Sequence, residues 1–164
     1  MGIDMQLLQS KLIFLNSVEA TETCAATLGS LISAPANIYL EGQLGAGKTT
    51  FVKGLLRGLG YEGLVKSPTY TLVELYPIAD QLIVHADLYR IKDPHELEDM
   101  GFRDYFSEKT IYLIEWASNA EDWLPKPLLL CTLKMPATMK GRLLEIQTFS
   151  RLTKPLQDWF DLKS

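Results

Sequence analysis

One stretch of this chain, residues 42–49, constrains its fold more than any other. It reads Gly-Gln-Leu-Gly-Ala-Gly-Lys-Thr and matches the pattern G-x-x-x-x-G-K-[ST] at every fixed position. Glycines let the backbone curl with its N–H groups pointing inward at an anion, and the lysine adds a positive charge. Because such a loop joins a strand to a helix, the sequence predicts a strand–loop–helix unit that binds phosphate.

The residues on either side of this loop fit that prediction. Residues 37–41 form a short β-prone run that follows Pro35. Within 50–59 the apolar residues recur with the spacing of one helix face, and Gly58 and Gly60 can end the helix. The helix would direct the positive end of its dipole at the loop. This context favours a phosphate site over a glycine turn with an incidental lysine.

We expect the loop and its flank to supply the contacts to a bound nucleotide. Lys48 would place its charge on the terminal phosphates. The hydroxyl of Thr49 could bind Mg²⁺, an ion that keeps most of its waters in protein sites. The expected binding residues are Gly42, Gln43, Leu44, Gly45, Ala46, Gly47, Lys48, Thr49 and Thr50.

Length and composition predict one cytoplasmic domain. A chain of 164 residues is long enough for one good core, so we expect a single domain over 1–164 with a peripheral tail from about 150. The net charge of -4 disfavours non-specific nucleic-acid binding. Cys24 and Cys131 lie too far apart for a metal motif and are expected to be free thiols. The start of the chain lacks a basic leader, and no apolar run is long enough to cross a membrane.

The remaining pattern mixes βα units with two hairpins. A purely parallel sheet would need a helix between all its strands. The predicted fold class is therefore α/β, a three-layer sandwich of P-loop NTPase type whose mixed sheet carries antiparallel hairpin strands. Predicted strands are 11–15, 71–76 paired with 81–87 through a turn at 77–80, 110–115, and 128–135 paired with 143–148 around 136–141. Predicted helices are 17–33 with Ser17 as N-cap, 95–100 with Asp93 as cap and Pro94 as first residue, and a last turn at 156–162.

Two apolar strands each end in an acid. Residues 82–86 lead to Asp87, and residues 111–114 lead to Glu115. Hydrolysis at a phosphate loop needs an acid near the metal and a group that orients water. One such strand end is usually only solvated, but two in a chain with an intact loop favour a catalytic site. Either acid could bind Mg²⁺ while the other positions water.

Three further positions are candidates for the same site. The segment 67–71, Ser-Pro-Thr-Tyr-Thr, is either a loop that approaches the γ-phosphate through Thr69 or a plain proline turn. His85 stands two residues before Asp87 and shares its face of the strand, which makes it a minor candidate. Trp116 follows Glu115 directly and is expected at the rim of the site.

Taken in order, these motifs closely resemble the bacterial TsaE (YjeE) family, over roughly residues 10 to 150. The resemblance is carried by the loop with Thr50, by Ser67-Pro68-Thr69-Tyr70-Thr71, by His85-Ala86-Asp87-Leu88-Tyr89-Arg90 and by Ile114-Glu115-Trp116. Glu96-Leu97 with Gly101, and the late Gly141-Arg142, are also similar to that family. Each motif is moderately specific alone, and their ordered combination is strong.

The resemblance implies a small Mg²⁺-dependent ATPase in the synthesis of N6-threonylcarbamoyladenosine at position 37 of tRNAs that read ANN codons. In that family the protein acts with TsaB and TsaD, where TsaD holds the transferase site, and a separate enzyme makes threonylcarbamoyl-AMP. The ATPase therefore meets tRNA only indirectly, through the complex, and the complex stimulates hydrolysis to allow repeated turnover.

The resemblance also assigns roles to particular residues. Those implied as catalytic are Lys48, Asp87, Glu115 and Thr69. Those implied at the metal are Thr49, Glu115 and Asp87, and Trp116 is implied near the nucleotide. One departure is visible: the family commonly has Asp after the first loop glycine, where this chain has Gln43. The missing charge puts in doubt a metal or water role for that position, but not phosphate binding by backbone N–H groups.

Two other functions remain alternatives. The first is a small P-loop nucleoside or nucleotide kinase, which would need a closing lid and arginines on the transferred phosphate. The five arginines of the chain are scattered, at positions 57, 90, 103, 142 and 151, although Arg90 could act as an arginine finger. The second is a nucleotide-gated binding module with negligible catalysis.

Overall fold

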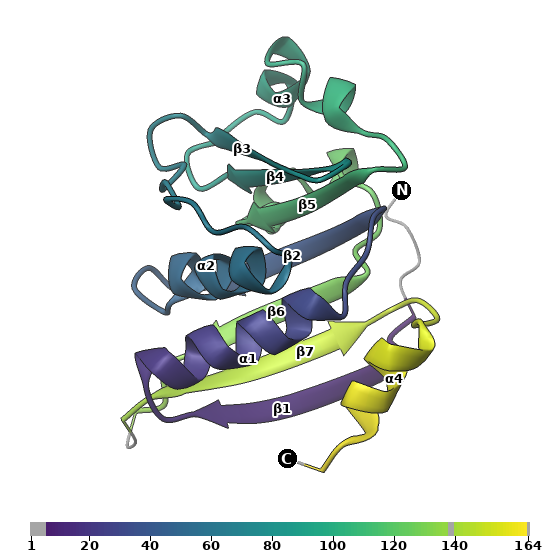
Figure 1. Ribbon diagram of the computed structural model, residues 1–164. Helices are drawn as coiled ribbons and strands as arrows, with labels where there is room; N and C mark the ends of the chain where they lie inside the picture. Colours follow the sequence, from purple (N-terminus) through teal and green to yellow (C-terminus); the bar gives the residue numbers. More distant parts are fainter. Residues whose placement is uncertain (1–5, 138–139, 164) are drawn as a thin grey trace.

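Seven strands form a single sheet in the order β1-β7-β6-β2-β5-β4-β3 (Figure 1). The computed structural model describes residues 6–137 and 140–163. The strands are β1 Gln9–Leu15, β2 Ala36–Gly42, β3 Val73–Ile78, β4 Gln81–Asp87, β5 Thr110–Glu115, β6 Leu129–Lys134 and β7 Arg142–Thr148. The helices are α1 Val18–Ser30, α2 Lys48–Gly58, α3 His95–Asp99 and α4 Lys154–Asp161, with short 3₁₀ helices η1 Phe102–Tyr105 and η2 Ala117–Trp123.

The sheet is mixed, as the sequence predicted. Strand β2 pairs in parallel with both β5 and β6, and β4 pairs in parallel with β5. Strands β3 and β7 run antiparallel to their hairpin partners β4 and β6, and β1 adds antiparallel to β7. The parallel centre therefore carries antiparallel strands on both sides.

Several element boundaries differ from those predicted. The turn between β3 and β4 contains only Ala79 and Asp80, because Pro77 stays in β3 and pairs with Leu82. Since β3 is an edge strand, the N–H that proline lacks is not needed there. In the second hairpin, positions 138–139 of the predicted turn lie outside the described residues.

The predicted cap is confirmed for α1 but not for α3. The hydroxyl of Ser17 accepts a hydrogen bond from the N–H of Ala20, as expected of an N-cap, but α1 ends at Ser30, three residues before the predicted end. Helix α3 begins at His95 with Pro94 at the N-cap, so the predicted cap at Asp93 and first residue at Pro94 are each one residue too early. The Asp93 carboxylate still accepts a hydrogen bond from the N–H of His95 at 3.0 Å.

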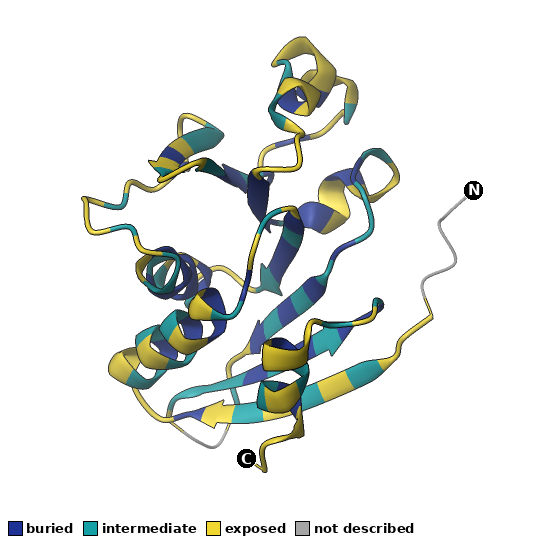
Figure 2. Cartoon of the chain, turned by 45° about the vertical axis from the view of Figure 1, so that its right-hand side comes forward, coloured by how far each residue is buried: buried dark blue, intermediate teal, exposed yellow. Residues whose placement is uncertain are grey.

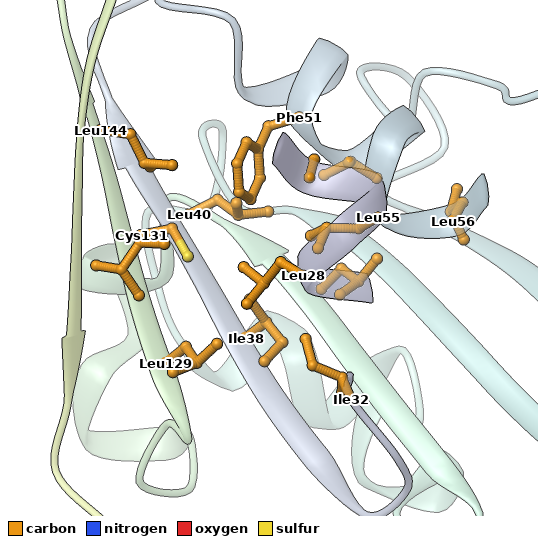
Figure 3. Close-up of a cluster of buried hydrophobic side chains, with 14 of the residues drawn as sticks. Leu28, Ile32, Ile38, Leu40, Phe51, Leu55, Leu56, Leu129, Cys131 and Leu144 are labelled. Carbon is orange, nitrogen blue, oxygen red and sulfur yellow. The ribbon is translucent and has the colours of Figure 1, made fainter. Parts of the chain in front are cut away.

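The two faces of the sheet bury separate hydrophobic cores. The larger lies under α1, α2 and α4 and includes Ile38, Leu40, Phe51 and Leu55 (Figure 3). The smaller lies on the opposite face under α3, η1 and η2, and includes Tyr112. Strand residues alternate between the two, as the two-residue period of a strand requires. Figure 2 shows the resulting dark-blue strands at the centre of the molecule.

Helices α1 and α2 approach each other closely through glycines. A Cβ on Gly58 would lie 2.0 Å from the carbonyl oxygen of Ala26, and one on Gly29 would lie 2.4 Å from that of Leu55. Only glycine allows this separation, so the helix pair packs backbone against backbone over the sheet.

The C-terminal segment packs on the larger core. Leu156 and Phe160 of α4 are 2% and 8% exposed, and the side chain of Gln157 exchanges hydrogen bonds with that of Gln9 in β1. Helix α4 therefore joins the two ends of the described chain. None of the helices within residues 6–137 and 140–163 is long and apolar enough to cross a membrane.

Candidate phosphate site at the carboxyl edge of the sheet

Parallel pairing brings three strand ends to one edge of the sheet. Strand β2 ends at Gly42, β4 at Asp87 and β5 at Glu115, and Asp87 pairs with Glu115 in the β4–β5 register. Ligands of parallel α/β sheets bind beyond the carboxyl ends of the strands. The loop 42–49 and both predicted acids therefore meet where the fold places a ligand.

The loop has a backbone that glycine alone accommodates. Gly42 has φ 146°, and a Cβ there would lie 2.6 Å from the carbonyl oxygen of Leu133. Gly47 has φ 105° and precedes the first residue of α2. The helix begins at Lys48, two residues earlier than predicted, so its first N–H groups belong to the loop itself.

Lys48 points back into the loop. Its Nζ donates to the carbonyl oxygens of Gly42 at 2.6 Å and Gln43 at 3.0 Å, and lies 4.7 Å from the ring centroid of Trp116. Burial lowers the pKa of Lys48, and the negative charges of Glu115, Asp87 and Glu41 oppose that shift. The acids are therefore close enough to act electrostatically on the loop lysine.

Arg142, the first residue of β7, donates hydrogen bonds to the backbone of the loop 42–49. Its Nε donates to the carbonyl oxygen of Ala46 at 3.0 Å and its Nη2 to that of Gly45 at 3.2 Å. In the sequence this arginine is one of five scattered ones, and only the resemblance of Gly141-Arg142 points to it. Because β7 follows β6 as a hairpin, its first residue returns to the edge that carries the loop.

The two acids have different surroundings. Glu115 is almost fully buried, and its Oε2 lies 2.7 Å from Nε2 of His85, which is also buried. Asp87 is partly exposed, and its Oδ1 accepts from the N–H of Tyr89 at 3.0 Å. Burial raises the pKa of Asp87; the Tyr89 N–H opposes this, and the charge of Glu115 adds to it. His85, expected to share a face with Asp87, thus contacts the other acid.

Trp116 follows the last residue of β5 and lies against the loop lysine. It adopts a left-handed backbone conformation with φ 57°, and its N–H donates to the carbonyl oxygen of Leu40 at 3.2 Å. Its ring centroid lies 5.1 Å from that of Tyr89, with the two ring planes tilted by 53°. This turn redirects the chain from β5 and places the indole over Lys48.

Thr69 is exposed and stands apart from the other candidates. Within the described ranges its hydroxyl bonds to Ser67 at 2.6 Å rather than to the loop 42–49. The neighbouring Tyr70 is 85% exposed and lies 5.2 Å from the guanidinium of Arg90. The structure therefore leaves this segment beside the site and does not bring Thr69 to the acids.

The donors at this edge suit a magnesium ion that is held mainly by phosphate and water. Thr49 is exposed in the first turn of α2, and Asp87 and Glu115 pair across neighbouring strands. Across 6–137 and 140–163, no group of three or more His, Cys, Asp or Glu side chains is arranged to hold a metal ion. Mg²⁺ uses one or two carboxylates and keeps several waters, so the residues fit this ion and do not form a metal cage.

The fold and loop define a P-loop NTPase-like protein. The structure is similar to the crystal structure of Bacillus subtilis YdiB, with a TM-score of 0.78 and 26% identity over 94% of this chain and 95% of that one. The sequence model described as "Threonylcarbamoyl adenosine biosynthesis protein TsaE" matches residues 15–143. The chain belongs to the TsaE family.

Curated relatives carry the same family name, tRNA threonylcarbamoyladenosine biosynthesis protein TsaE. The Haemophilus influenzae protein is 58% identical over 89 residues, which cover 54% of this chain and 56% of that protein. The Bacillus subtilis protein is 41% identical over 72% of this chain and 75% of its own length. The Rickettsia bellii protein is 35% identical over 80% of this chain and 90% of its own length.

Proposed function

We propose that this protein binds ATP and Mg²⁺ at the loop 42–49 and hydrolyses ATP in the synthesis of threonylcarbamoyladenosine on tRNA. It would act in the cytoplasm with TsaB and TsaD, and would meet tRNA only through that complex. The observation that carries the proposal is the meeting of the loop, Lys48 and two strand-end acids at one sheet edge. Membership of the TsaE family supplies the pathway.

Different residues of the site would bind the phosphates, position the metal and water, and shield the lysine. The loop N–H groups and Lys48 would hold the phosphates, and Lys48 would exchange its bonds to the carbonyls of Gly42 and Gln43 for phosphate oxygens. Asp87 and Glu115 would share the tasks of binding the metal hydration shell and orienting the attacking water. Bound Mg²⁺ would neutralise charge on the phosphate oxygens. Trp116 would cover the lysine and limit access of bulk water.

Arginine placement argues against a kinase. Arg57 pairs with Glu22 and Arg103 with Glu98, while Arg142 is bonded to the outer side of the loop. Arg90 lies against Tyr70, in the exposed segment beside the site. These four side chains form no converging group around a transferred phosphate, which phosphoryl transfer to a second substrate would need.

ATP hydrolysis with and without the TsaB–TsaD pair tests the proposal. We expect stimulation by the pair, and a loss of about 100-fold or more in Lys48→Ala because the charge that stabilises the phosphates is removed. Arg151→Ala, at an exposed position, is the matched loss of a cation and should hydrolyse normally. Absence of hydrolysis in the presence of both partners would leave the nucleotide-gated binding module as the function.

A further inference from the structure

We infer that His85 is a positioning residue for Glu115, which fixes the carboxylate so that its second oxygen serves the phosphate site. The inference rests on the proposed function, since Glu115 is assigned there to hydrolysis. His85 itself would touch neither nucleotide nor water.

The strand register brings the two side chains together. His85 pairs with Leu113 and Asp87 with Glu115 across β4 and β5, so the side chains of His85 and Glu115 rise from neighbouring strands on the same face of the sheet. Ile83 and Leu113, which share that face, belong to the core under α2. His85 therefore sits one layer below the site and reaches Glu115 from the protein side.

The bond between them is short and shielded. Nε2 of His85 and Oε2 of Glu115 are 2.7 Å apart, with side-chain exposures of 0% and 4%. A carboxylate only accepts hydrogen bonds, so Nε2 is the donor when Glu115 is ionised. In a site that excludes water, such a bond to a charged acceptor is stronger than a neutral one.

The other ring nitrogen indicates why histidine stands here. Nδ1 of His85 is buried without a hydrogen-bond partner in the described part of the chain. Buried polar atoms without a partner are uncommon because each costs free energy that an apolar side chain would not. A phenylalanine or leucine would fill this core position without that cost, so packing alone does not account for an imidazole. The hydrogen bond to Glu115 accounts for the imidazole at this position.

The arrangement leaves one oxygen of Glu115 for the site. Within residues 6–137 and 140–163, Oε2 is held by His85, and Oε1 forms no hydrogen bond. Without His85 the glutamate would be free to rotate about its terminal torsion, which is a soft one. Supporting residues of this kind typically change activity by about 10–100-fold while leaving substrate contacts in place.

ATP hydrolysis by variants, with TsaB and TsaD present, tests the inference. In His85→Phe we expect kcat to fall about 10–100-fold and KM to stay within about threefold, because the phosphate loop is untouched. Gln carries an N–H near the position of Nε2, so His85→Gln should recover most of kcat. The matched control is His95→Gln, which changes the only other histidine of the chain, an exposed one, and should hydrolyse at the wild-type rate.

A double mutant separates positioning from a general effect on folding. If His85 acts through Glu115, adding His85→Phe to Glu115→Gln should lower kcat no further. Additive losses, or wild-type kcat in His85→Phe, would overturn the inference. ATP affinity and thermal unfolding of each variant are measured alongside, and a loss of kcat explained by a fall in the folded fraction would also overturn it.

A second readout does not depend on hydrolysis. In the ¹⁵N spectrum of the wild-type protein, His85 should be the Nε2–H tautomer, and Glu115→Gln should shift that signal. The Nδ1–H tautomer would overturn the inference whether or not ATP is hydrolysed. If the wild-type protein hydrolyses no ATP with its partners, the proposed function fails instead, and the two outcomes are distinct.

Discussion

Asp87 lies in surroundings that oppose its negative charge. Burial and the nearby Glu115 raise its pKa above the ordinary value of 3.8. A raised pKa in the folded protein means that the folded state holds the proton more tightly than the unfolded chain does. The contribution of Asp87 to stability therefore falls as the pH rises through 3.8 toward the raised value, and stays low at neutral pH.

Asp87→Asn should consequently stabilise the free protein while lowering its turnover. Asparagine keeps the oxygen that accepts from the N–H of Tyr89 and removes the charge. We expect Tm at pH 7.5 to rise by roughly 1–3 °C, with the gain vanishing on acidification through the ordinary pKa. Calorimetry at pH 7.5 and at a pH below the ordinary pKa of 3.8 measures this change in Tm. Asp99→Asn, at an exposed position, is the control. A lower Tm at pH 7.5 would show that Asp87 stabilises the fold.

Arg142→Ala should weaken nucleotide binding more than it slows hydrolysis at saturating ATP. The variant loses two hydrogen bonds that hold the carbonyls of Gly45 and Ala46, each contributing about 1 kcal/mol. The loop would then lose preorganisation, and we expect Kd to rise about 10-fold. Titration calorimetry with an ATP analogue measures it. An unchanged Kd would mean that the loop holds its shape without this arginine.

At the scale of elements, the packing of α1 on α2 depends on missing side chains. Gly58→Ala would improve intrinsic helix propensity, yet its Cβ would lie 2.0 Å from the carbonyl oxygen of Ala26. The helices must separate, so we expect a loss of about 1–3 kcal/mol in unfolding free energy. Urea denaturation measures it. Thr23→Ala on the exposed side of α1 should change stability by less than about 0.5 kcal/mol, and a stabilised Gly58→Ala would contradict the packing.

Local patterns in the sequence predicted most elements and the class of the fold. The apolar runs in 81–87 and 110–115 predicted β4 and β5 at their observed bounds, because each strand is specified by its own residues. The order of strands was not predictable in this way, since β2 lies between β5 and β6, which come much later in the chain.

The same distinction applies to the site. The loop 42–49 is contiguous and could be recognised by its spacing, and two acids were found at strand ends. The contact of His85 with Glu115 depends on the β4–β5 register, and the contact of Arg142 with the loop spans 96 residues. Neither contact can be predicted from local periodicity. Both contacts follow only from the pairing of the strands in the sheet.

For the whole molecule, α4 connects the far end of the sheet to the larger core. Because β7 runs antiparallel to β6, and β6 runs parallel to β2, the end of β7 lies at the edge opposite the phosphate loop. Helix α4 follows that end (Figure 1). Its contribution to stability should therefore be separable from the site.

Truncation after Thr153 should destabilise the fold without altering the folded site. Burial of Leu156 and Phe160 contributes at most about 3–6 kcal/mol, and the bonds between Gln157 and Gln9 are also lost. We expect a lower denaturation midpoint with unchanged nucleotide Kd at a temperature where the variant is folded. As a control, Trp159→Phe should keep most of the stability. If the truncated chain had the same denaturation midpoint as the full-length protein, α4 would be dispensable for stability.

The position of β2 in the sheet has a consequence for the order in which the protein is made. The ribosome completes the loop 42–49 early, but β2 finds its neighbours β5 and β6 only after residues 110–134 have emerged. The hydrogen bond to the carbonyl oxygen of Gly45 forms later still, because its donor Arg142 follows Gly45 by 97 residues. Pairings this distant make folding slow. A nascent chain therefore carries the complete motif 42–49 long before the strands beside it are paired, and the residues at this edge of the sheet come together only when nearly all of the sheet exists.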